Sequence, residues 1–152
     1  MNPDFFISVI VPVHNGAAFL ADAVESIQRQ GDAPLEIIIV DDGSTDGTAQ
    51  LIPRLTGNIR AAAQSNRGPA AARNTGLRMA RGNVIGFLDA DDLWPANKLA
   101  LQLACLADHP DIGIVHGSIQ CIRTKDEGRR TKNETFSDPY LGLQLGSALC
   151  RA

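Results

Sequence analysis

The side chains best suited to chemistry form an acidic run, Asp89-Ala90-Asp91-Asp92, directly after the apolar residues 84–88. Carboxylates packed this closely repel one another unless a cation or hydrogen-bond donors neutralise them. Hard divalent ions such as Mg²⁺ and Mn²⁺ take oxygen ligands and commonly bridge one or two carboxylates to substrate phosphates. The run therefore indicates a metal and phosphate site, although an acidic turn or helix cap would use the same residue types.

A second polar loop, residues 41–47, also follows an apolar segment and begins with Asp41 and Asp42. Its Asp, Gly, Ser and Thr residues could serve as turn formers and helix caps. Two carboxylates at a strand end can instead accept hydrogen bonds from the N–H and O–H groups of a nucleotide. The loop also matches the first half of a calcium-binding loop, but Pro53 stands where a bidentate glutamate is required, which excludes calcium.

A block of arginines separates the two acidic loops. Residues 1–47 contain eight carboxylates and one arginine, whereas residues 48–88 contain six arginines and no carboxylate. Arg67 and Arg73 flank small residues at an expected helix start, where the positive end of the helix could meet a pyrophosphate. Arg78 and Arg81 fit a solvated helix face. No aromatic residues are interleaved with the block, so anionic small molecules fit it better than nucleic acid.

Hydrophobic spacing predicts that strands and helices alternate along the chain. The expected strands are residues 7–13, 35–40, 59–63, 84–88, 112–116 and 119–122, and the expected helices are residues 17–30, 48–55, 69–80 and 96–107. This order predicts an α/β fold with a mainly parallel sheet that helices cover on both faces. Open sheets of this kind bind ligands at the carboxyl ends of their strands, where both acidic loops should lie.

Length and composition fit one globular domain: 152 residues, of which 44% are hydrophobic and 20% charged. No apolar run approaches the ~20 residues that a membrane-spanning helix needs. The N-terminus lacks a signal-peptide pattern, which predicts a cytoplasmic location. The widely spaced cysteines, Cys105, Cys121 and Cys150, are expected to be reduced. The charged segment 123–134 is expected to form an exposed loop.

Signatures of other enzyme classes are missing from the sequence. There is no Gly-x-Gly-x-x-Gly after the first strand and no P-loop, which argues against dehydrogenases and P-loop NTPases. There is also no Gly-x-Ser-x-Gly elbow of a serine hydrolase. His14 follows a strand and could line a site, whereas His109 and His116 are more often structural positions.

Four segments in order resemble family 2 glycosyltransferases with the GT-A (Rossmann-like) fold. They are SVIVPVHN (8–15), VDDGSTDGT (40–48), NRGPAAARNTG (66–76) and GFLDADDLWP (86–95). Residues 145–151 weakly resemble the acceptor-side segment of the family. The resemblance implies transfer of a sugar from a nucleotide diphospho-sugar, usually a UDP-sugar, with inversion at the anomeric carbon. It also implies a DXD-type motif that binds Mn²⁺ or Mg²⁺, and a place in cell-surface polysaccharide biosynthesis.

The resemblance further implies which residues bind the donor and the metal. The expected donor-binding residues are Pro12, Val13, His14, Asn15, Asp41, Asp42, Gly68, Arg73, Asp89, Ala90 and Asp91, and the expected metal ligands are Asp91 and Asp92. The family's general base follows the acceptor segment, so we expect residues 1–152 to be a single, incomplete donor-binding domain whose catalytic base lies beyond Ala152. A non-catalytic module that binds a nucleotide or sugar stays open as the alternative. The acceptor (glycan, lipid or protein), a membrane association through it, and the oligomeric state stay open too.

Overall fold

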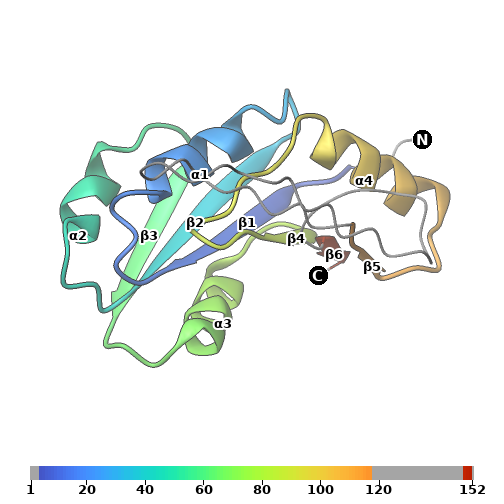
Figure 1. The fold of residues 1–152 in the computed structure, drawn as a ribbon. Coiled ribbons are helices and arrows are strands. Elements are labelled where there is room, and N and C mark those ends of the chain that lie inside the picture. Colours follow the sequence, from blue (N-terminus) through green and yellow to red (C-terminus); the bar gives the residue numbers. More distant parts are fainter. Residues whose placement is uncertain (1–3, 118–148, 152) are drawn as a thin grey trace, which may run out of the picture.

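The computed structural model describes residues 4–117 and the backbone of residues 149–151, which form a sheet with helices on both faces (Figure 1). The strands are β1 (Ile7–Val13), β2 (Leu35–Asp42), β3 (Ile59–Gln64), β4 (Val84–Phe87), β5 (Ile114–Val115) and β6 (Leu149–Arg151). Their order in the sheet is β3-β2-β1-β4-β6-β5. The neighbours among β3, β2, β1 and β4 are parallel, and β6 is antiparallel to both β4 and β5. The predicted mainly parallel α/β sheet is confirmed.

Helices cover the sheet because its central strands are apolar on both faces. The helices are α1 (Leu20–Gln28), α2 (Thr48–Leu51), the 3-10 turn η1 (Ile52–Arg54), α3 (Pro69–Met79) and α4 (Lys98–Asp108). Val9 and Val11 of β1 pack in the larger core with α1 and α4, whereas Ile10 between them packs in a smaller core with Ala72 of α3. This alternation is the period of two that a pleated strand imposes. No helix of residues 4–117 is long and apolar enough to cross a membrane.

Several element bounds differ from the sequence-based predictions. The first helix begins at Leu20 rather than residue 17, because Asn15 takes a positive φ of 56° and the chain turns before the helix starts. The predicted helix 48–55 is divided into α2 and η1, since Pro53 lacks the N–H that a continuing α-helix would use. The predicted strand 119–122, the charged segment 123–134 and residues 140–148 lie outside the described residues.

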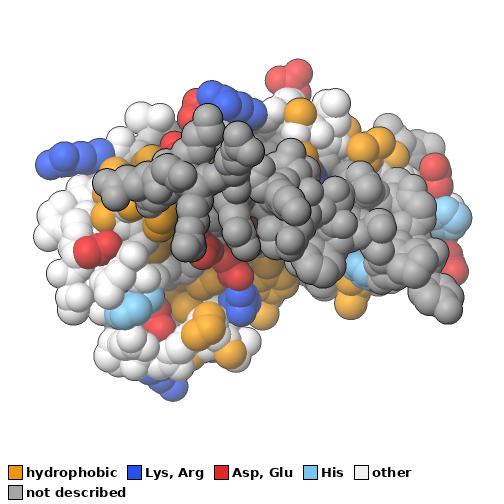
Figure 2. Space-filling view, viewed as in Figure 1, with side chains coloured by type: hydrophobic (Ala, Val, Ile, Leu, Met, Phe, Trp, Pro, Cys, Tyr) orange, Lys and Arg blue, Asp and Glu red, His pale blue; other side chains and the backbone are white. Residues whose placement is uncertain are grey.

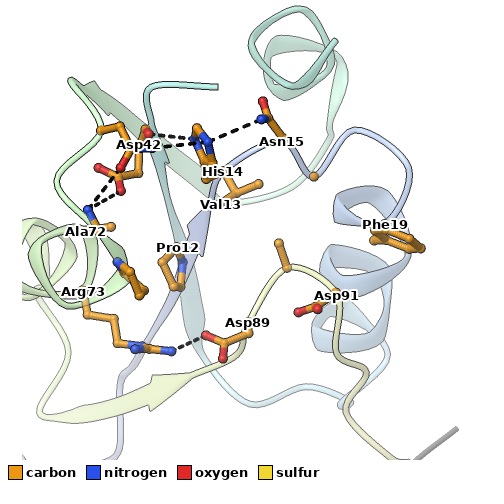
Figure 3. Close-up of a pocket in the computed structure, with 15 residues that line it drawn as sticks. Pro12, Val13, His14, Asn15, Phe19, Asp42, Ala72, Arg73, Asp89 and Asp91 are labelled. Atoms are coloured by element: carbon orange, nitrogen blue, oxygen red, sulfur yellow. Dashed lines mark hydrogen bonds and ion pairs between the residues drawn. The ribbon is translucent and has the colours of Figure 1, made fainter. Parts of the chain in front are cut away.

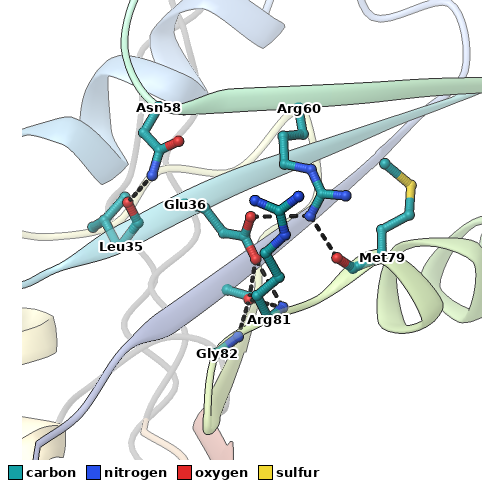
Figure 4. Close-up of polar contacts among 8 residues, drawn as sticks. Leu35, Glu36, Asn58, Arg60, Met79, Arg81 and Gly82 are labelled. Carbon is teal, nitrogen blue, oxygen red and sulfur yellow. Dashed lines mark hydrogen bonds and ion pairs between the residues drawn. The ribbon is translucent and has the colours of Figure 1, made fainter.

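A buried carboxylate fixes the turn between α3 and β4 to the amino ends of β1 and β2 (Figure 4). Glu36 Oε1 accepts hydrogen bonds from Ser8 Oγ at 2.7 Å and from Arg81 N at 2.9 Å, and Glu36 Oε2 pairs with Arg60 at 3.2 Å. Burial would raise the pKa of Glu36, but these hydrogen bonds and the arginine outweigh it and lower the pKa. The helix before this turn, α3, and the loop after β4 carry residues of the site described below.

Gly76 lies where α3 packs closely on the sheet, against Ile10 of β1. A Cβ at this position would lie well inside 3.0 Å of the Ile10 side chain, which is fully buried. We expect Gly76→Ala to lower the free energy of unfolding by about 1–2 kcal/mol, because overpacking outweighs the better helix propensity of alanine. Chemical denaturation of the variant and the wild type measures the difference in the free energy of unfolding. Gly113→Ala, where a Cβ would meet nothing within 4 Å, is the control, and equal stabilities of the two variants would contradict the expectation.

Candidate functional site

An open cavity of about 550 Å³ lies at the carboxyl ends of β1, β2 and β4, beside the first turn of α3 (Figure 3). Three loops and one helix start therefore meet at the edge of the sheet where the sequence predicted a ligand. The lining residues are Pro12, Val13, His14, Asn15, Gly16, Phe19, Asp42, Asn66, Gly68, Pro69, Ala72, Arg73, Asp89, Ala90 and Asp91. A volume of this size is typical of small-molecule sites.

The structure brings together every predicted donor-binding residue except Asp41. Successive residues of a strand point to opposite faces, so Asp42 lies on the α3 face with the cavity and Asp41 lies on the other. Asp41 Oδ1 instead accepts a hydrogen bond from Ser44 N at 2.9 Å, which fixes the turn after β2. The predicted metal ligand Asp92 does not line the cavity either, whereas Asp91 does. Arg67 is exposed and only its backbone takes part in the site.

Asp42 connects the end of β2 to the loop that leads into α3. Its Oδ1 accepts from Gln64 Nε2 at 2.8 Å and from Arg67 N at 2.9 Å, and its Oδ2 accepts from Gly68 N at 2.8 Å. Burial would raise the pKa of Asp42, but hydrogen bonds from Gln64, Arg67 and Gly68 together lower it. The carboxylate is therefore ionised at neutral pH and holds two backbone N–H groups of this loop in place.

The acidic run after β4, residues 89–92, carries negative charge that is only partly neutralised by neighbouring residues. Asp89 forms an ion pair with Arg73 of α3 at the base of the cavity (Figure 3). Burial and then the charges of Asp91 and Asp89 raise the pKa of Asp92. Figure 2 shows acidic side chains beside a basic one near the middle of this face. Among residues 4–117, no three His, Cys, Asp or Glu side chains already converge as a metal cage.

Five lining residues were not predicted as site residues: Gly16, Phe19, Asn66, Pro69 and Ala72. Asn66, Pro69 and Ala72 belong to a motif that the sequence analysis had singled out, so the signal was present. Phe19 falls within the helix predicted over residues 17–30 and was not predicted as a site residue. It precedes α1 and is 50% exposed. Phe19 lines the cavity from the position just before α1, and no sequence pattern indicated this.

The comparisons with known proteins agree with this geometry. Residues 8–148 match the family model Glycosyl transferase family 2. The UDP-Glc:alpha-D-GlcNAc-diphosphoundecaprenol beta-1,3-glucosyltransferase of Escherichia coli is 33% identical over 122 residues, which are 78% of this chain and 47% of that protein. This chain therefore belongs to glycosyltransferase family 2. It spans 18–47% of the length of the first three curated relatives.

Two groups of solved structures share the fold. TarS 1–349 of Staphylococcus aureus in complex with UDP-GlcNAc superposes with a TM-score of 0.67 at 26% identity, covering 81% of this chain and 37% of that one. A mannosyltransferase from Pyrobaculum calidifontis in complex with GDP-Man and Mn²⁺ superposes with a TM-score of 0.62 at 38% identity, covering 73% and 34%. The neighbours are GT-A glycosyltransferases, and the GT-A fold predicted from the sequence is confirmed.

Proposed function

We propose that this chain binds a nucleotide diphospho-sugar as the donor part of a glycosyltransferase. The observation that carries the proposal is the convergence of the β1, β2 and β4 exit loops and the α3 start on one cavity. The start of α3 carries the positive end of the helix dipole, and Gly68 and Pro69 there line the cavity. Arg73 adds a guanidinium one turn further on. Together they favour a diphosphate beside Gly68 and Arg73.

The hydrogen bonds of Asp42 favour uracil as the base of the nucleotide. A carboxylate offers about four acceptor positions, and protein donors occupy three of those on Asp42. One position is left for a base that presents a single ring N–H, as uracil does between two carbonyl groups, whereas guanine presents two adjacent donors. The E. coli relative is named for UDP-Glc and TarS binds UDP-GlcNAc, which also supports a UDP-sugar.

The acidic run has the donor chemistry for Mn²⁺ or Mg²⁺. Burial and neighbouring carboxylates raise the pKa of Asp92, so this position has negative charge that a cation would relieve. Asp91 and Asp92 would hold the ion together with phosphate oxygens, which is how such ions bind when the protein provides only one or two carboxylates. A bound dication would supply Lewis-acid stabilisation of the departing nucleoside diphosphate.

The residues of this chain act on the leaving group and on the nucleotide. Arg73 and the start of α3 offset negative charge on the diphosphate, and Asp42 with the loop after β1 orients the base. Inverting transfer also needs a base that removes the proton from the acceptor hydroxyl. No carboxylate of residues 4–117 outside Asp42 and the acidic run lines the cavity, so we propose that the base comes from the acceptor-side part of the protein.

The donor proposal is tested by calorimetric titration of UDP into the protein with Mn²⁺ and with EDTA. We expect UDP to bind at least about tenfold more tightly with Mn²⁺, and Asp91→Asn and Asp92→Ala to remove this gain. Asp108→Asn, an exposed carboxylate at the end of α4, should leave it unchanged. Equal UDP affinity with Mn²⁺ and EDTA would show that metal and nucleotide do not bind together here.

The second candidate is a non-catalytic nucleotide-sugar-binding module, because the base is unassigned. Release of UDP from a UDP-sugar in the presence of candidate acceptors, measured on this chain and on the whole gene product, separates the two. The E. coli relative is named for a lipid-diphosphate acceptor. We therefore propose polyprenyl-diphosphate-linked sugars as the first acceptors to try. A cytoplasmic site of action, with contact to the membrane through such an acceptor, belongs to the same proposal.

A further inference from the structure

The hydrogen bonds of His14 define the tautomer of its ring (Figure 3). His14 Nδ1 lies 2.9 Å from the backbone oxygen of Asp42. A carbonyl oxygen only accepts hydrogen bonds, so Nδ1 must carry the proton. In the neutral ring Nε2 is then an acceptor, and it lies 3.3 Å from Asn15 Nδ2 and 3.2 Å from Asn66 Nδ2.

The two asparagine amides are oriented by their other contacts, so both present an NH₂ group to the ring. Asn15 Oδ1 accepts from Thr45 N at 2.8 Å. Asn66 Oδ1 accepts from Gly68 N at 3.3 Å. The bond from Thr45 N assigns the Asn15 oxygen independently of His14. The contact of Asn66 Oδ1 is the longer of two that Gly68 N makes, since Gly68 N also donates to Asp42 Oδ2 at 2.8 Å. The ring therefore contacts three segments: Nδ1–H donates to the end of β2, and Nε2 accepts from the loop after β1 and from the loop before α3.

We propose that His14 is a positioning residue whose neutral Nδ1–H imidazole joins the three loops of the nucleotide cavity, and that protonation of Nε2 releases them and weakens donor binding. A proton on Nε2 would replace the acceptor with a donor that faces two NH₂ groups. The Asn15 amide cannot turn over without losing its bond from Thr45 N, and the Asn66 amide would lose its longer contact with Gly68 N. The nucleotide in this statement rests on the proposed function, whereas the tautomer and the loop contacts do not.

The charges around the ring do not restore the lost acceptor. The elements packed around the ring are β2 with the loop after it, the loop before α3, and α3. Among residues 4–117, their charged side chains are Glu36, Asp41, Asp42, Asp46, Arg67, Arg73 and Arg78. Asp42 attracts a proton on the ring, and the same interaction contributes to the low pKa of Asp42. Asp46 is bonded to Thr48 and to Ala17 N, and Asp41 is bonded to Ser44 N. The ring itself is exposed, so protons reach it.

The first experiment detects the tautomer on the chain without nucleotide. A long-range ¹H–¹⁵N spectrum at pH 8 distinguishes Nδ1–H from Nε2–H rings, and loss of one signal set in His14→Gln assigns His14 among the three histidines. We expect Nδ1–H at His14. We also expect the side-chain amide signals of Asn15 and Asn66 to shift together as the pH falls to 5.5. An Nε2–H ring, or amide signals that do not shift as the pH falls, would overturn the proposal.

The second experiment measures the dissociation constant of UDP-glucose, whose phosphates are diesters without the phosphate pKa near 6 of a monoester. From pH 8 to pH 5.5 we expect about tenfold weaker binding to the wild type, because a ring protonated at Nε2 no longer accepts from the two amides. His14→Gln keeps an acceptor near the Nε2 position, so its dissociation constant should change less with pH than that of the wild type. His14→Phe should bind weakly at both pH values.

The outcomes separate the two proposals. A pH-independent wild type, or a His14→Gln variant with the wild-type pH profile, would contradict the role of His14. A wild type with the expected tautomer and amide shifts but no binding of UDP-glucose at pH 8 would contradict the proposed donor and leave the positioning role supported. Circular dichroism of both variants verifies that they are folded.

Discussion

Asp42→Asn is expected to weaken UDP binding at least about 100-fold, because an amide has lost one of the two oxygens that this site uses. Both Asp42 oxygens accept from backbone N–H groups, those of Arg67 and Gly68. Whichever way the asparagine amide turns, its NH₂ group faces one of these donors. The loop before α3 must then move away from the cavity, and with it the start of α3.

Asp41→Asn is the matched control for this variant. Asp41 is the preceding residue of the same strand, but it lies on the other face and accepts only from Ser44 N among the described contacts. An asparagine can replace that acceptor, so we expect UDP affinity within about threefold of the wild type. Calorimetric titration of UDP into both variants measures these affinities. Equal losses in the two variants, or wild-type affinity in Asp42→Asn, would show that the difference between the two faces is irrelevant to binding.

Lys98→Met is expected to raise the free energy of unfolding by about 2 kcal/mol at pH 7. Lys98 is fully buried at the start of α4, and burial lowers its pKa from 10.5 to about 7. A drop of this size corresponds to about 5 kcal/mol. The contact of Nζ with the Trp94 ring, 4.1 Å from its centre, and the bond to Gln102 return part of that cost. Methionine fills a similar volume without a charge.

The low pKa of Lys98 also predicts in which direction the free energy of unfolding changes with pH. Between pH 7 and pH 10.5 the unfolded chain binds a proton at Lys98 that the folded chain does not. The free energy of unfolding should therefore rise with pH across this window, and the cost of the charge is fully present below it. Urea denaturation at several pH values should show a smaller rise in Lys98→Met. Arg54→Met, an exposed cation at the end of η1, should change stability by less than about 0.5 kcal/mol. A destabilised Lys98→Met at every pH would mean that the buried amine stabilises the fold.

The sequence was a good predictor of the strands and of the edge at which they place their loops. The apolar strands β1, β2 and β4 end in polar loops, and parallel strands that alternate with helices must bring those ends to one side of a sheet. It predicted less well where side chains point at the loops themselves. The sequence predicted a helix from residue 17 and took Asp41 and Asp42 as a pair of donor-binding residues, because spacing shows neither the exact start of a helix nor the face on which a strand ends.

Other features depend on contacts between residues far apart in the chain. β6 lies between β4 and β5, an insertion that chain order does not predict. The same holds for the ring of His14, whose tautomer is defined by Asp42, Asn15 and Asn66 together.

The sequence alone therefore determined the fold class, the family resemblance and the edge of the sheet where the acidic and glycine-rich loops meet. Only the tertiary structure decided which of those side chains share a cavity, which carboxylate is held by backbone N–H groups, and that a lysine is buried beneath Trp94. The physical reason is that hydrophobic periodicity is a local property of the chain. Hydrogen-bond partners and the burial of a charge depend on residues that only the folded chain brings together.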